Sequence, residues 1–155
     1  MNQERVILKE EIKEKIKFLE SRINLTLQSL AVKWNRMGTN AYCIGTPCPF
    51  CKDAFWRIRH KKGIEEFFVS IGYVDLMCIM CLCPPQICST HEKGSSERSI
   101  IGKMISKYPR RTYVDEMKIK DYLKVIHAFT DLLERDIEEK RKLKSILDDL
   151  EDEED

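Results

Sequence analysis

The chain has 155 residues, of which 43% are hydrophobic and 34% charged, and its formal net charge is +1. This length and hydrophobic content suit one folded domain with its own core. No apolar run approaches the roughly 20 residues of a membrane span, and the charged start of the chain does not match a signal peptide. We therefore expect a cytoplasmic protein without membrane contact, in a compartment that keeps thiols reduced.

The charge is unevenly distributed along the chain. Seven of the last eight residues are acidic, and without these the chain has 27 basic against 19 acidic residues, a balance of +8. We expect a disordered acidic tail over residues 151–155 and a moderately basic body. Such a tail would partly screen the body from nucleic acid.

Residues 1–38 carry the periodicity of an amphipathic helix. Apolar side chains recur at steps of three or four, with Lys and Glu between them. These side chains are Ile12, Ile16, Leu19, Ile23, Leu27, Leu30, Trp34 and Met37. Gly38 stands where a C-cap glycine would end such a helix. The pattern predicts one long N-terminal helix.

Residues 39–95 hold all seven cysteines and four of the five prolines. Two Cys-x-x-Cys pairs stand out, Cys48/Cys51 and Cys78/Cys81. In a reducing compartment this spacing indicates metal binding before a disulfide. Each pair can present two sulfurs to one ion from a tight turn, and two pairs supply the four soft ligands that tetrahedral zinc prefers. We predict a first zinc site at these four residues.

The segment between the pairs is consistent with a β-hairpin. Residues 55–59 form a strand-like run, 61–63 a plausible turn, and 64–74 either a second strand or a helical turn. The CPFC motif, a hairpin and a second CxxC are similar to zinc-ribbon proteins over residues 48–81. The resemblance implies a structural zinc ion. Lys52 stands where ribbons usually have glycine, and extra cysteines surround both pairs.

Four soft ligands remain once the first site is assigned: Cys43, Cys83, Cys88 and His91. They have the composition of a second zinc site, and Cys88-x-x-His91 is an acceptable ligand spacing. The alternative for Cys43 and Cys83 is that each is a small buried hydrophobic residue, since unpaired cysteines are often buried.

Two other chemistries compete for the thiols. The spacing Cys43-x4-Cys48-x2-Cys51, followed by a distant cysteine, matches that of plant-type ferredoxins and permits an iron–sulfur cluster in a redox protein or sensor. The residues around it lack the small-residue loop that surrounds such clusters. Thiol–disulfide exchange at one CxxC would call for a thioredoxin-like βαβ pattern, which the sequence does not show.

A basic and aromatic run lies on the expected hairpin. Trp56, Arg57, Arg59, Lys61 and Lys62 could grip phosphates while an aromatic ring stacks on a base. The preferred interpretation is a solvated surface, with Phe55 and Trp56 in the small core of the ribbon.

Residues 96–150 return to a helical pattern. ERSIIGKMISK, residues 97–107, predicts a short helix that ends before Pro109. Thr112 is a plausible N-cap with Asp115 three residues on. The apolar stripe that follows is Ile119, Tyr122, Ile126, Phe129, Leu133 and Ile137, and after EEKRK it resumes at Leu143, Ile146 and Leu150.

These observations predict a mainly α fold. Two long antiparallel helices are joined by a cysteine-rich, zinc-ribbon-like module, and the C-terminal helix packs on the first. Four-cysteine zinc sites are usually closed, and the sequence has no phosphate loop, nucleophile elbow or metalloprotease motif. The composition therefore favours a metal-binding interaction protein over an enzyme. Its expected partner is a protein or nucleic acid, and the long helices offer a surface for a homodimer.

Overall fold

The computed structural model describes residues 3–31, 48–60, 81–84, 86–87, 100 and 117–153. Within these ranges the chain forms three helices and no strands: α1 (Gln3–Ala31), α2 (Pro49–His60) and α6 (Ile119–Asp152). The predicted mainly α class is confirmed. No helix in the described part of the chain has the length and apolarity to span a membrane.

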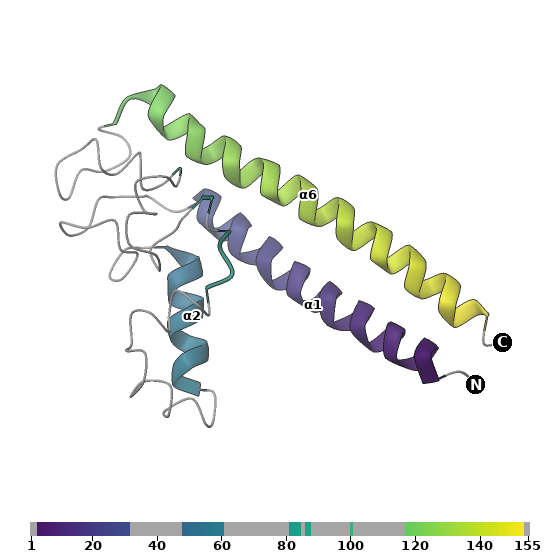
Figure 1. The fold of residues 1–155 in the computed structure, drawn as a ribbon. Coiled ribbons are helices and arrows are strands. Elements are labelled where there is room, and N and C mark those ends of the chain that lie inside the picture. The colour runs from purple at the N-terminus through teal and green to yellow at the C-terminus, as the bar shows by residue number, and fades with distance from the viewer. Residues whose placement is uncertain are drawn as a thin grey trace.

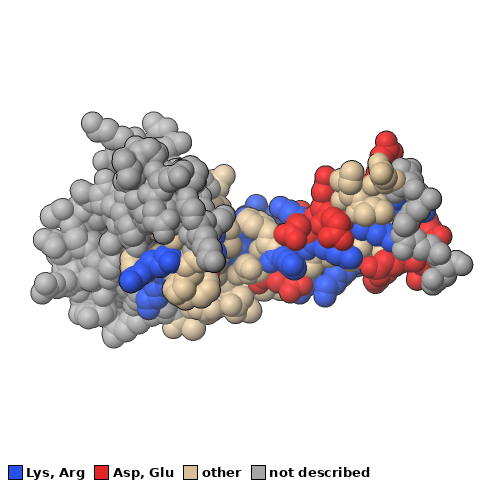
Figure 2. Space-filling view, turned by 90° about the horizontal axis from the view of Figure 1, so that it is seen from below, with Lys and Arg blue, Asp and Glu red and all other residues tan. Residues whose placement is uncertain are grey.

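The two long helices α1 and α6 lie side by side and antiparallel (Figure 1). Three interhelical ion pairs give the alignment: Arg5 with Glu153, Glu20 with Lys140, and Arg22 with Asp136. In these pairs the residue numbers along α1 rise while those along α6 fall, as expected for antiparallel helices. The start of α1 therefore lies beside the end of α6. Charged side chains of both signs are interspersed over this part of the surface (Figure 2).

The helix α1 covers most of the predicted N-terminal helix. Ile12, Ile16 and Leu19 are buried, as the periodicity predicts. Residues 32–38, with the expected C-cap Gly38, lie outside the described residues.

The helix α6 begins at Ile119, after Lys118 in extended conformation at φ −64° and ψ 134°. Asp121 in its first turn suits the positive end of the helix dipole. The predicted N-cap Thr112 lies outside the described residues. The prediction of a disordered tail is wrong at its start, because Glu151 and Asp152 continue the helix.

The buried seam differs from the predicted apolar stripe. Leu27 and Ile137 are half exposed, at 51% and 50%, whereas Asp136 is 1% exposed. On α6 Phe129 is buried as predicted, but the other buried residues lie one position before predicted stripe residues, at Asp121, Val125, Leu132 and Asp136. The physical reason is that polar groups are satisfied inside the seam: Asp136 accepts two hydrogen bonds from Arg22, and Thr26 donates to the carbonyl of Arg22 at 2.7 Å.

The short helix α2 packs against α1 at the end of the pair away from the chain termini (Figure 1). Phe50, Ala54 and Ile58 recur every four residues and are buried on one face. The predicted strand over residues 55–59 is therefore wrong, because this run is helical. The expected turn at 61–63 and return segment at 64–74 lie outside the described residues, as does the short helix at 97–107 apart from Ile100.

The α2 helix is anchored in a hydrophobic cluster where the three helices meet. The Phe50 ring stacks on Phe129 of α6, with centroids 6.1 Å apart and planes 8° from parallel. The buried members of the cluster are Leu25, Cys48, Phe50, Cys83, Ile87, Met117, Val125, Phe129 and Leu132. The cysteine-bearing segments thus lie directly against the main core.

Candidate metal centre

Four of the eight predicted metal ligands lie in the described part of the chain. Cys48, Cys51, Cys81 and Cys83 are all in the thiol form. Cys43, Cys78, Cys88 and His91 lie outside the described residues. The structure therefore bears on three of the four ligands of the first site and on one ligand of the second.

The first Cys-x-x-Cys pair straddles the start of α2. Cys48 precedes the helix and Cys51 lies in its first turn, with Pro49 between them at a position that suits proline. The carbonyl of Cys48 accepts a hydrogen bond from the Lys52 amide at 3.1 Å. Both sulfurs therefore lie beside the helix N-terminus, which carries partial positive charge. Cys48 is buried, whereas Cys51 is partly exposed.

The second cysteine cluster meets the first through Cys81. The Cys51 thiol hydrogen-bonds to Cys81, which lowers the pKa of the Cys81 thiol. Burial opposes this effect, a backbone hydrogen bond involving Cys83 reinforces it, and Cys48 is near enough to raise the same pKa. The Arg57 guanidinium of α2 acts to lower it. Two segments thirty residues apart thus bring two of the predicted ligands, Cys51 and Cys81, into contact.

The side chain of Cys83 is buried in the main core and acts electrostatically on Arg22 of α1. It is 7% exposed and belongs to the main hydrophobic cluster. Two hydrogen bonds to Asp136, each 2.7 Å, raise the pKa of the Arg22 guanidinium, and Cys83 acts in the same direction. This position is the one expected for a small buried residue, which was the alternative to a second metal site.

The described residues do not themselves complete a metal site. Among them, no three side chains of His, Cys, Asp or Glu are grouped closely enough to hold an ion. The fourth ligand predicted for the first site, Cys78, lies outside these residues. The tetrahedral site therefore stays a prediction, supported by the contact between Cys51 and Cys81.

The proposed nucleic-acid residues follow the exposed face of α2. Trp56 is 59% exposed and stacks on His60 with ring centroids 4.4 Å apart. The expectation that Phe55 and Trp56 fill a ribbon core is wrong, since both are exposed. Arg57 pairs with Asp53 at 2.8 Å, and Arg59 lies over the Phe55 ring, 5.4 Å from its centroid. Lys61 and Lys62 lie outside the described residues.

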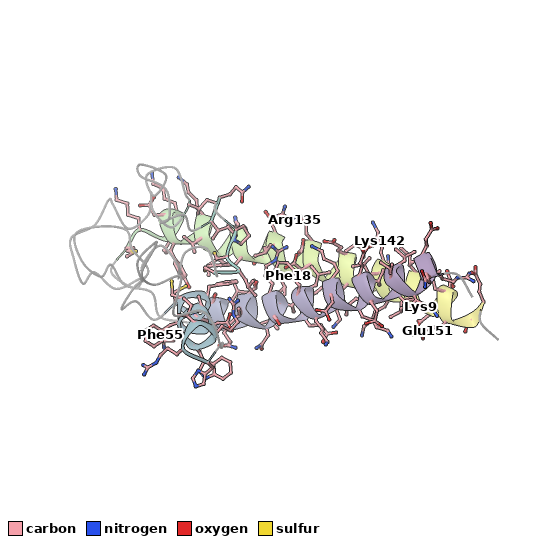
Figure 3. All side chains as sticks on the ribbon, turned by 60° about the horizontal axis from the view of Figure 1, so that its bottom comes forward. Lys9, Phe18, Phe55, Arg135, Lys142 and Glu151 are labelled. Atoms are coloured by element: carbon pink, nitrogen blue, oxygen red, sulfur yellow. The ribbon has the colours of Figure 1, made fainter. Side chains whose placement is uncertain are left out.

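An open groove of about 550 Å³ runs between α1 and α2 beside this face. Its walls include Gln28 of α1 and Lys52, Asp53 and Trp56 of α2. Figure 3 shows the labelled side chain of Phe55 on α2, at the end of the helical pair away from the chain termini. The groove and the Trp56 indole thus form one continuous surface of mixed polarity.

Sequence reasoning missed the two arginines beside the thiols. Arg57 is four residues after Asp53 on α2, a spacing that signals an ion pair only once the segment is known to be helical. The sequence around Arg22 does not indicate its role, because Asp136 and Cys83, which act on it, are far away in the chain. Comparison with protein-family models, curated proteins and solved structures finds no match.

Proposed function

We propose that this chain is a metal-binding interaction protein in which Cys48, Cys51, Cys78 and Cys81 hold a structural zinc ion. The observation that carries the proposal is the hydrogen bond between Cys51 and Cys81. Two thiols from separate CxxC motifs meet next to the start of a helix. Soft thiolates in this number and spacing are the donors that zinc prefers.

The role of the ion would be to join two pieces of chain. Four thiolates leave no open coordination position, so the ion would supply cross-linking free energy and no catalysis. Cys48 and Cys51 would hold it from α2, while Cys81 would attach the segment that continues to Cys83 and Ile87 in the core. The zinc ion would in this way fix α2 and residues 81–87 against the helical pair.

Metal analysis tests this proposal directly. We expect colourless protein, purified anaerobically without added metal, to contain at least one zinc ion per chain by elemental analysis. Cys51→Ser and Cys81→Ser should each lose that ion. Cys83→Ser is the matched variant. If its zinc content equals that of the unmodified chain, the protein has one site. If the content falls from two zinc ions per chain to one, Cys83 belongs to a second site with Cys43, Cys88 and His91.

Two outcomes would reject the zinc proposal. Brown protein that contains iron and absorbs visible light would replace it with the iron–sulfur alternative, in which Cys43 is a ligand. Metal-free protein whose Cys51 and Cys81 are joined in a disulfide would replace it with thiol redox chemistry. Peptide mapping under non-reducing conditions distinguishes that case.

The exposed face of α2 is the surface that we assign to a macromolecular partner. Trp56 supplies a stacking surface and Arg59 a positive charge beside Phe55. If the partner is nucleic acid, the affinity should fall as the salt concentration rises. The double variant Trp56→Ala/Arg59→Ala should then lose nucleic-acid binding. Absence of binding by the unmodified protein to single- and double-stranded nucleic acid would leave a protein as the partner class.

A further inference from the structure

A second apolar stripe runs along α6, beside the seam that faces α1. Its residues follow one another at steps of four, three, four, three and four, which is the heptad pattern of a coiled coil. They are Ile119, Leu123, Ile126, Thr130, Leu133 and Ile137. None of them belongs to the buried face of α6, which consists of Asp121, Val125, Phe129, Leu132 and Asp136. Helix α6 thus has one covered stripe and one further heptad stripe.

This second stripe is open to solvent. Ile119, Leu123 and Ile137 are 76%, 41% and 50% exposed, and the other three are partly buried. The Thr130 hydroxyl donates to the Ile126 carbonyl at 2.8 Å. Its polar group is therefore satisfied within the helix, and its methyl group can join an apolar contact. A coiled-coil stripe with this much exposed apolar surface fits a partner helix.

The stripe is compatible with its own reversed copy. The spacings between successive stripe residues are the same in both directions along the helix. An antiparallel second copy would therefore place its Ile137 level with Ile119, and its Leu133 level with Leu123. An isologous contact around a two-fold axis requires this kind of self-complementarity. The centre of the contact would fall between Ile126 and Thr130.

The charges beside the stripe select the antiparallel direction. Lys120 and Glu134 are exposed and occupy equivalent heptad positions, each directly after an apolar stripe residue. In the antiparallel arrangement Lys120 of one copy lies beside Glu134 of the other, and the symmetry repeats the pair. In a parallel arrangement the equivalent flanking positions of two copies lie on opposite sides of the seam, so Lys120 and Glu134 could not form this pair. Charge complementarity therefore identifies a second copy as the occupant.

We propose that this chain forms a homodimer in which the α6 stripes of two copies pack antiparallel. The two α1–α6 pairs then form a four-helix bundle with both α6 helices at its centre. This inference is independent of the proposed zinc site, because it rests on no cysteine. Metal content and oligomeric state are separate measurements, so one proposal can fail while the other holds.

Sedimentation velocity on the full chain tests the dimer. We expect the mass of two copies, and a monomer for Ile137→Lys. Ile146→Lys is the matched control, because Ile146 lies on the same helix at 47% exposure but outside the stripe. The same substitution at this control site should leave the dimer intact.

A charge swap tests the direction of packing. Lys120→Glu should weaken the dimer about tenfold or more in Kd, because the introduced carboxylate of each copy then lies beside Glu134 of the other. Adding Glu134→Lys should restore the original affinity. Circular dichroism and metal analysis on each variant confirm that folding and the thiol site are unchanged. A monomeric unmodified chain, a dimer that survives Ile137→Lys, or a swap that restores nothing would each overturn the proposal.

Discussion

At the scale of single residues, a largely buried ion pair joins the two long helices. The side chain of Asp136 is 2% exposed, and that of Arg22 is 19% exposed, with two hydrogen bonds between them. The guanidinium also lies 5.0 Å from the centroid of the Phe18 ring. A carboxylate in this position is stabilised only while its partner is present. The pair therefore fixes the register of α1 against α6 as well as their direction.

We predict that Asp136→Ala destabilises the protein by about 3 kcal/mol, because it leaves the Arg22 charge without its partner in a largely buried place. Urea unfolding measures the effect. The control is Glu138→Ala, which removes an exposed carboxylate paired with Arg141 and should leave the midpoint essentially unchanged. Replacing both buried partners, with Arg22→Met and Asp136→Leu, should recover most of the loss. An Asp136→Ala midpoint equal to that of the control would contradict the prediction.

At the scale of elements, α2 depends on tertiary packing. With only 12 residues it would be marginal in isolation. Its apolar face, centred on Phe50 against Phe129, holds it to the pair. Cys48, directly before the helix, belongs to the same hydrophobic cluster as Phe50, so the position of the first thiol pair depends on this packing.

Phe50→Ala should cost about 3–5 kcal/mol of unfolding free energy, the usual range for a buried phenylalanine. Hydrogen exchange should show lost protection across α2, while the middle of α6 stays protected. Phe55→Ala, on the exposed face of the same helix, is the control and should change neither measurement. Equal protection of α2 in the two variants would show that other contacts hold it.

The elements also show how far sequence reasoning reaches. Both long helices and their antiparallel pairing follow from apolar periodicity. On α6 the predicted stripe shares Phe129 with the buried face but is otherwise displaced by one residue. The buried Asp121 and Asp136 are polar, and their burial depends on partners that the sequence does not reveal. The alternating residues 55–59 suggested a strand, although Phe50, Ala54 and Ile58 repeat at helical spacing. For the thiols, motif spacing predicted a site of four cysteines; of these, Cys51 and Cys81 are in contact, and the neighbouring arginines were not predicted.

At the scale of the whole molecule, the two ends of the helical pair are held differently. One end joins α2 and residues 81–87 in a cluster that includes Cys48 and Cys83. Toward the other end, Ile12 and Ile16 are buried and Arg5 pairs with Glu153. Among the described residues, the thiols that we propose as zinc ligands all lie at the first end.

If zinc joins the two CxxC motifs, chelation should therefore loosen one end of the molecule and spare the other. We predict that a chelator exposes sites between residues 32 and 116 to limited proteolysis, while fragments that contain α1 and α6 persist. Most of the helical circular dichroism signal should remain, because the α1–α6 seam contains no thiol in its distal half. The Cys51→Ser variant should show the same cleavage without chelator. Unchanged protease resistance after verified metal removal would contradict this dependence, and so would loss of the whole helical signal.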